Sequence, residues 1–258
     1  MLSGKVALIT GSTRGLGRTM AEWLAREGAG IVISGRADAA VAEAVEAIAA
    51  LGVPAWGYPA DLAVPGEARR MAAGALGLVP GIDILINNAG MSIRSNFWEV
   101  SDADWETQVN VNFRSPFVLA QVIGKQMIDR QIAGRIINVG TIGARACHTN
   151  AMVYDSAKGG IETMTRNMAY ELGPFGITVN CVVPGAIADR PGARVIDPEG
   201  RKRYERHIPA GRVGRADDIA AAVMFFASPA SQYTTGQSLL VDGAHSSYLP
   251  ESPKGFAF

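Results

Sequence analysis

The chain has 258 residues, of which 48% are apolar, and its 24 Lys and Arg residues balance 24 Asp and Glu residues. This length and apolar fraction fit one domain, residues 1–258, with a substantial core. The balanced charge argues against a protein whose whole surface binds nucleic acid or membrane, and no apolar run is long enough to span a bilayer.

Short β-branched runs alternate along the chain with longer helical stretches. Strands are predicted at residues 6–10, 31–34, 53–59, 82–87, 135–139, 177–183 and 238–241, with a weaker pattern at 53–59. Helices are predicted at residues 15–27, 39–51, 65–76, 102–130, 152–172 and 217–227. This alternation predicts an α/β fold with a parallel sheet, helices on both faces and ligands beyond the carboxyl ends of the strands.

Residues 188–209 have no clear periodicity. Since long loops in compact domains often close over a substrate, we predict a substrate lid there.

The two cysteines, Cys147 and Cys181, make neither a disulfide framework nor a zinc site, so no metal is expected. The apolar run at residues 6–9 is too short for a secretory signal, and a cytoplasmic location is therefore expected.

Three glycines, Gly11, Gly15 and Gly17, lie between the first predicted strand and the first predicted helix. Glycine lets the backbone approach a pyrophosphate, and the helix that begins near Gly15 presents free N–H groups to phosphates. The spacing is GxxxGxG rather than the commoner GxGxxG, but its place in a βαβ unit predicts a dinucleotide site. The candidate cofactor residues of this turn are Gly11, Ser12, Thr13, Arg14, Gly15, Leu16 and Gly17.

The end of the second predicted strand favours NADP over NAD. An acidic residue there would hydrogen-bond the ribose 2′-hydroxyl of NAD, but the sequence reads Ser34-Gly35-Arg36 and has no acid before Asp38. Arg36 and Arg14 can instead hold a 2′-phosphate, because guanidinium binds phosphate as a fork. The alternative is that both arginines are solvated surface charges.

Tyr154 and Lys158 are four residues apart on a predicted helix, so they share one face, and Thr141 offers a hydroxyl upstream. An isolated tyrosine has a pKa of about 10, too high for a base at neutral pH. A nearby ammonium and a positive nicotinamide ring both favour the phenolate. Tyr154 can then accept the proton of a substrate hydroxyl while hydride passes to the nicotinamide, and donate it in the reverse direction.

These motifs resemble the short-chain dehydrogenase/reductase family nearly from end to end. Besides TGxxxGxG and YxxxK, further motifs occur in the family's order: Asp61-Leu62, Asn87-Asn88-Ala89-Gly90, Asn112, Pro184-Gly185 and Val241-Asp242-Gly243. The resemblance implies a Rossmann-type, doubly wound parallel sheet of seven strands in three αβα layers. It also implies a nicotinamide cofactor, a small-molecule substrate and usually a homotetramer.

The resemblance further implies roles for the matching residues. The cofactor residues it adds are Asp61 and Leu62 beside the adenine, Asn88, Ala89 and Gly90 along the cofactor, Pro184, Gly185 and Ile187 at the nicotinamide, and Lys158, with Tyr154, at the ribose end. The implied catalytic residues are Asn112, Thr141, Tyr154 and Lys158. Thr141 would orient the substrate oxygen, and Asn112 would hold a water that links Lys158 to solvent.

Two positions depart from the family pattern. Thr141 stands where serine is usual; it keeps the hydroxyl but adds a methyl group and a stiffer χ1 angle. Asp189 stands where a threonine often contacts the cofactor, and a carboxylate there sits poorly beside phosphates.

The segments that bind substrate in this family offer several polar side chains here. The candidate substrate residues are Arg94, Arg145, His148 and Asn150. This polarity indicates a sugar, a sugar acid or a polyol rather than a steroid or a long acyl chain, and the cationic side chains favour an anionic group on it. The alternative is that Arg94 and Arg145 pair with protein acids.

The leading hypothesis is an NADP-preferring dehydrogenase or reductase that acts on the CH–OH group of a sugar-like alcohol. One alternative is a 3-oxoacyl thioester reductase, whose acidic carrier protein would dock on a basic lid. Another alternative, motivated by Thr141 and Asp189, is a dinucleotide-binding sensor without turnover.

Overall fold

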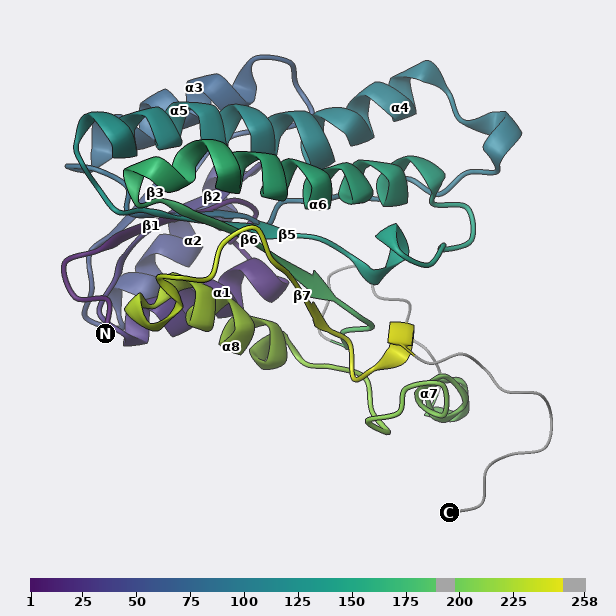
Figure 1. Cartoon of the computed structure of the whole chain (residues 1–258). Coiled ribbons are helices and arrows are strands. Elements are labelled where there is room, and N and C mark those ends of the chain that lie inside the picture. Colours follow the sequence, from purple (N-terminus) through teal and green to yellow (C-terminus); the bar gives the residue numbers. More distant parts are fainter. Residues whose placement is uncertain (189–197, 248–258) are drawn as a thin grey trace.

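The computed structural model describes residues 1–188 and 198–247 (Figure 1). Seven parallel strands in the described residues form one sheet in the order β3-β2-β1-β4-β5-β6-β7. The strands are β1 (Val6–Ile9), β2 (Gly30–Gly35), β3 (Ala55–Pro59), β4 (Ile84–Asn87), β5 (Arg135–Val139), β6 (Thr178–Pro184) and β7 (Ser238–Val241). The predicted Rossmann-type sheet is confirmed, and the weaker strand pattern at residues 53–59 corresponds to β3.

The longer helices are α1 (Gly15–Arg26), α2 (Asp38–Ala49), α3 (Glu67–Leu78), α4 (Asp102–Val109), α5 (Ser115–Asp129), α6 (Met152–Leu172), α7 (Pro198–Glu205) and α8 (Ala216–Ala227). Short 3₁₀ turns lie at Phe97–Glu99, Ile142–Ala144, Gly173–Phe175, Pro229–Ser231 and His245–Ser247. Figure 1 shows α1, α2 and α8 on one face of the sheet and α3, α4, α5 and α6 on the other.

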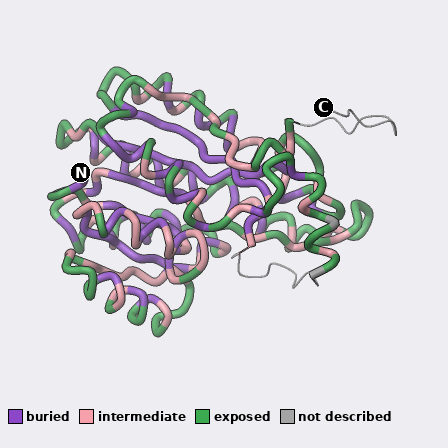
Figure 2. Tube along the Cα trace, turned by 90° about the horizontal axis from the view of Figure 1, so that it is seen from below, coloured by how far each residue is buried: buried purple, intermediate pink, exposed green. Residues whose placement is uncertain are grey.

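The strands are apolar on both faces because each face carries a layer of helices. In β2, Ile31 and Ile33 belong to the apolar cluster on the α1, α2 and α8 side, whereas Val32 belongs to the cluster that contains Met71 of α3 and Ile123 of α5. This alternation divides the core into two layers. Figure 2 shows the buried trace running through the middle of the molecule along the strands.

The single helix predicted at residues 102–130 differs from the structure, because a π-helical segment at Asn110–Arg114 separates α4 from α5. The side-chain amide of Asn112 donates to Gln108 O and to Met91 O, both at 2.8 Å, and its Oδ1 accepts from Met91 N. Asn112 therefore binds both a carbonyl of the preceding helical turn and the loop after β4. Such π segments in helices are frequent at functional sites.

The predicted lid at residues 188–209 lies partly outside the described residues. Its second half is more ordered than the sequence pattern indicated, because Pro198–Glu205 form α7. The ring of Tyr204 on α7 packs edge-on against His245, at 5.5 Å between centroids. The region after α7 is anchored by Ile208, which is 3% exposed. Asp189 falls outside the described residues, so the expectation for it stays a prediction.

All described strands are parallel, so their carboxyl ends lie along one edge of the sheet. The loops that follow β1, β2, β3, β4, β5 and β6 meet at this edge, which is where ligands bind in open α/β sheets.

Candidate active site

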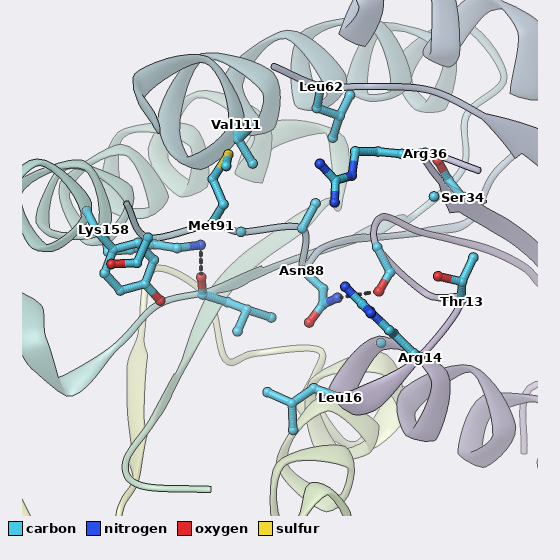
Figure 3. Close-up of a pocket in the computed structure, with 18 of the residues that line it drawn as sticks. Thr13, Arg14, Leu16, Ser34, Arg36, Leu62, Asn88, Met91, Val111 and Lys158 are labelled. Carbon is cyan, nitrogen blue, oxygen red and sulfur yellow. Dashed lines mark hydrogen bonds between the residues drawn. The ribbon is translucent and has the colours of Figure 1, made fainter. Parts of the chain in front are cut away.

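A cleft of about 520 Å³ opens at the carboxyl edge of the sheet (Figure 3). Many of the predicted site residues line it: Gly11, Thr13, Arg14, Leu16, Gly17, Arg36, Asp61, Leu62, Asn88, Ala89, Gly90, Arg94, Thr141, Tyr154, Lys158 and Pro184. The glycine turn, the Tyr154 and Lys158 pair and the loop after β4 are thus brought to one site from distant parts of the sequence.

The glycine turn is held in a conformation that requires glycine. Gly11 has a φ of +62°, in the left-handed region that glycine adopts readily. A Cβ atom on Gly17 would collide with the carbonyl oxygen of Gly11, and one on Gly35 would lie 2.6 Å from Thr13 Cγ2. Side chains at Gly17 and Gly35 would therefore displace the backbone of a turn that lines the cleft.

Thr10 and Asn88 connect the ends of β1 and β4 beneath the cleft. The Thr10 hydroxyl accepts from the backbone N–H groups of Asn88 and Ala89, both at 2.9 Å. The Asn88 amide donates to Thr10 O at 2.8 Å and to Gly11 O at 3.1 Å. Asn88 therefore fixes the shape of the glycine turn from below.

The first turn of α1 has the properties of an anion site. No side chain of the described residues caps it, and it contains no acidic residue, so its N–H groups are available to a phosphate. Arg14 precedes α1 and Arg36 follows β2, and Figure 3 shows both side chains at the same cleft as Asn88. Glycines without room for Cβ atoms, helix N–H groups and two guanidinium groups together fit a dinucleotide with an added phosphate.

Tyr154 and Lys158, on the first turns of α6, reach the cleft from the other side. Both side chains are largely buried, with exposed fractions of 8% and 2%. The Lys158 ammonium donates to the backbone oxygen of Val139 at 2.7 Å, which fixes its position at the end of β5 (Figure 3). The Thr141 hydroxyl, also on the cleft wall, accepts from Gly143 N at 3.3 Å. This arrangement combines a phenol, an ammonium and a hydroxyl, which is what proton transfer at a carbonyl or alcohol needs.

Asn112 lies directly behind this group and does not line the cleft. An added Cβ atom on Gly90 would lie 3.2 Å from Asn112 Oδ1 and 3.6 Å from Lys158 Nζ. Gly90 thus allows the amide and the ammonium to approach each other. Both N–H groups of the Asn112 amide are already used by backbone carbonyls, which leaves a lone pair of Oδ1 as the acceptor for a water.

The four candidate substrate residues have different positions. Arg94 lines the cleft, and its Nη1 donates to Thr149 O at 2.6 Å. Arg145 and His148 do not line it, because they pair with Glu162 at 2.6 Å and with Asp155 at 2.9 Å. The Arg145–Glu162 pair agrees with the expectation that a protein acid neutralises Arg145. Arg94 differs from the same expectation, because its partner in the described residues is a backbone carbonyl and not an acid.

Asn150 also lies outside the cleft wall. Its backbone adopts a φ of +58°, and its carbonyl oxygen accepts from Ser95 N at 3.1 Å. It therefore supports the loop that carries Arg94.

Four predicted cofactor residues do not line the cleft and instead shape the backbone around it: Ser12, Gly15, Gly185 and Ile187. The buried Ser12 hydroxyl donates to Ile9 O and accepts from Ser34 N, which connects the ends of β1 and β2. A Cβ atom on Gly185 would lie 2.6 Å from Asp242 Cβ. Ile187 bridges to Gly214, so the chain after β6 is held against the start of α8.

Other residues line the cleft that were not predicted as site residues from the sequence: Ser34, Gly35, Ala60, Met91, Ser92, Val111, Val139 and Gly140. Most of them stand at or just after the carboxyl end of a strand. That position is itself the signal that could have identified them.

Within residues 1–188 and 198–247, no cluster of His, Cys, Asp and Glu side chains could hold a metal ion. No helix in the same residues is long and apolar enough to cross a membrane.

The chain matches known proteins over nearly its whole length. A family model described as enoyl-(acyl carrier protein) reductase matches residues 11–245. The 3-oxoacyl-(acyl-carrier-protein) reductase FabG of Aquifex aeolicus is 36% identical over 94% of this chain and 97% of its own. The 2-dehydro-3-deoxy-D-gluconate 5-dehydrogenase of Formosa agariphila is 35% identical over 94% of this chain and 92% of its own.

Among solved structures, a blue fluorescent protein from a metagenomic library, in complex with NADPH, is similar to this chain. It superimposes with a TM-score of 0.87 and is 34% identical over 95% of this chain and 98% of its own. The relatives favour an oxidoreductase over a dinucleotide-binding sensor. The chain belongs to the short-chain dehydrogenase/reductase family, and it is an NAD(P)-dependent oxidoreductase that acts on CH–OH groups.

Proposed function

We propose that this enzyme is an NADP-preferring dehydrogenase that interconverts a secondary alcohol and a carbonyl on a polar, sugar-like substrate that carries a carboxylate. The observation that supports this most directly is the position of Arg94. Its side chain is on the wall of the cleft that holds Thr141 and Tyr154, and it pairs with no acid in the described part of the chain. A guanidinium in this position is suited to a carboxylate.

In the proposed reaction, Tyr154 accepts the proton of the substrate hydroxyl at its phenolic oxygen, and it donates this proton in the reverse direction. A bound nicotinamide supplies the hydride acceptor or donor. Lys158 holds positive charge beside Tyr154, which favours the phenolate. The Thr141 hydroxyl orients the substrate oxygen, and Asn112 holds a water behind Lys158 that connects it to solvent.

The preference for NADP rests on Arg14 and Arg36. Both line the cleft near the end of β2, and β2 provides no acidic residue at this end that could bind a 2′-hydroxyl. The NADPH complex of the similar metagenomic protein supports this choice of cofactor.

The experiment that tests the proposed function measures the reduction of NADP and NAD by the enzyme, with sugar acids, neutral sugars, polyols and acyl thioesters as substrates. With the preferred sugar acid, Arg94→Met should raise KM about tenfold or more, because a charge-assisted hydrogen bond is lost. Arg166→Met, on the exposed face of α6, is the control. An Arg94→Met enzyme with unchanged KM for the acid would contradict the assignment of the carboxylate to Arg94.

The second candidate function is reduction of a 3-oxoacyl thioester. It is favoured by the similarity to FabG of Aquifex aeolicus and by the exposed cations Arg201, Lys202 and Arg206 on and after α7, which could meet an acidic carrier. Turnover of acyl thioesters without turnover of sugar acids would establish it.

The proposed assembly is a homotetramer of this chain in the cytoplasm. Supporting evidence is the set of exposed aromatic side chains Trp105 on α4, Phe113 on the π segment and Phe117 on α5, with exposed fractions of 44%, 37% and 48%. Exposed apolar patches are typical of contacts between chains. Light scattering after size-exclusion chromatography gives the mass that tests this expectation.

A further inference from the structure

The loop at residues 141–151, between β5 and α6, is fastened to α6 by two contacts (the α6 clamp: the Arg145–Glu162 ion pair and the His148–Asp155 hydrogen bond). Arg145 Nη2 lies 2.6 Å from Glu162 Oε2, and its Nε lies 3.3 Å from both carboxylate oxygens. Glu162 is 7% exposed, so its carboxylate needs such a partner.

The second pair uses both oxygens of Asp155. His148 Nδ1 lies 2.9 Å from Asp155 Oδ1, and the backbone N–H of His148 donates to Oδ2 at 2.8 Å. Asp155 therefore fixes both the ring and the backbone of His148. It also stands in the first turn of α6, where a negative charge is favourable.

The two acids stand beside the reactive side chains on α6. Asp155 directly follows Tyr154, and Glu162 lies one helical turn after Lys158. A shift of the loop relative to α6 is therefore also a shift relative to the phenol and the ammonium.

The clamp also packs on the residue that holds the Thr141 hydroxyl. Gly143 N donates to Thr141 Oγ1 at 3.3 Å. An added Cβ atom on Gly143 would collide with both Asp155 Oδ1 and His148 Nδ1, so the pair occupies the space that a side chain at Gly143 would fill. The position of the Thr141 hydroxyl thus depends on Gly143, and Gly143 packs against His148 and against Asp155 of α6.

The same loop sets the position of Arg94. Thr149 O, the carbonyl next to His148 in sequence, accepts from Arg94 Nη1 at 2.6 Å. The neighbouring Asn150 O accepts from Ser95 N at 3.1 Å. The loop after β4 is therefore held in place through the loop that the clamp fastens.

We propose that His148 and Asp155, supported by Arg145 and Glu162, are positioning residues that set the distance from Thr141 and Arg94 to Tyr154. This inference rests on the proposed catalytic roles of Thr141 and Tyr154. It assigns the loop residues Arg145 and His148 to the geometry of the site rather than to contact with substrate. Reaction rates depend steeply on such geometry, because a misplacement of about 1 Å can lower them a hundredfold.

The test compares full-length His148→Ala and His148→Asn, since the Nδ2 of asparagine can take the place of the ring Nδ1. Cys147→Ala is the control, because it changes the exposed side chain next to His148 in the same loop. Hydrogen–deuterium exchange of residues 141–151 reports the clamp without any substrate. The kcat with the best substrate of the panel measures catalysis at the site, and the Kd for NADPH measures cofactor binding there.

We expect His148→Ala to speed exchange in the loop about tenfold and to lower kcat about tenfold or more, with the Kd for NADPH within about twofold of the wild type. His148→Asn should recover most of both losses, and Cys147→Ala should resemble the wild type. The proposal is overturned if His148→Ala leaves loop exchange unchanged, if the loop loosens while kcat stays the same, or if His148→Asn fares no better than His148→Ala.

Failure of the proposed function has a different signature. If Tyr154→Phe turned over like the wild type, the catalytic roles would be wrong, whereas the exchange of the 141–151 loop would still show whether the clamp exists. Wild-type exchange and turnover in His148→Ala, together with an inactive Tyr154→Phe, would reject the clamp alone.

Discussion

Replacing Arg36 with glutamine is expected to weaken the binding of NADPH and to leave the binding of NADH nearly unchanged. Arg36 follows β2 and lines the cleft together with Arg14 (Figure 3). Neither guanidinium has an ion pair or a hydrogen bond to a protein group within residues 1–188 and 198–247. Both are therefore available to a 2′-phosphate, which NADH lacks.

The size of the effect follows from the exposure of Arg36. A hydrogen bond to a charged group contributes about 1.5–3 kcal/mol, and solvent screening places an exposed arginine at the lower end, about 1.5 kcal/mol. Since about 1.4 kcal/mol corresponds to a tenfold change in an equilibrium constant, the Kd for NADPH should rise about tenfold. Fluorescence titration of NADPH and NADH measures both constants, and added salt should reduce the difference between the wild type and Arg36→Gln.

The matched control is Arg26→Gln, which removes an exposed arginine at the other end of α1, 3.8 Å from Glu22 and outside the cleft. It should leave both constants unchanged. Equal weakening of NADPH and NADH by Arg36→Gln, or an unchanged Kd for NADPH, would refute the role of Arg36 at a 2′-phosphate.

Three further predictions concern the protein around the site. One thiol should react with a disulfide reagent in the native protein at pH 8, and two should react in denaturant. The reason is that Cys147 is exposed, whereas burial raises the pKa of the Cys181 thiol to about 12. Fast reaction of two thiols in the native protein would contradict this prediction. Gly17→Ala should lower the melting temperature and weaken NADPH binding by about 1–3 kcal/mol, since its Cβ atom meets Gly11 O, whereas the control Gly77→Ala, with nothing within 4 Å, should not. The Arg212 guanidinium and a backbone N–H group lower the pKa of Asp218 to about 2, so its stabilisation is present above about pH 4 and is lost as the pH falls towards 2. Asp218→Asn should therefore cost about 1 kcal/mol of unfolding free energy at pH 7 after allowance for solvent screening, and a cost that is the same at pH 2.5 would show that the carboxylate charge is not the cause.

The sheet could be predicted from the sequence because strands and helices are local patterns. The runs at residues 31–33 and 84–86 are apolar at every position, which indicates a sheet covered on both sides. Most of the motifs that reach the cleft stand at strand ends, where parallel topology brings them together, whereas Tyr154 and Lys158 reach it from α6. The π segment could not be predicted, because it depends on the contact between Asn112 and Met91, which are far apart in sequence.

The substrate residues were harder to predict because a charged side chain shows its partner only in three dimensions. Arg94, Arg145 and His148 are all polar, and all three lie in segments that bind substrate in the family that the sequence resembles. Only Arg94 lines the cleft, while the other two pair with acids on α6. The helical period does give one indication that Arg145 has an acidic partner on α6. Glu162 lies two turns after Tyr154, on the face of the helix that meets the loop.

The most direct test of the catalytic assignment is the turnover of Tyr154→Phe with NADP across the substrate panel, measured beside its Kd for NADPH. The phenyl ring keeps the packing of a side chain that is 8% exposed and removes only the oxygen that is proposed to transfer the proton. The predicted result is a Kd within about twofold of the wild type and a kcat lower by a factor of about 10² to 10⁴. Wild-type turnover by Tyr154→Phe would contradict the account, because the proton would then have to pass through another group.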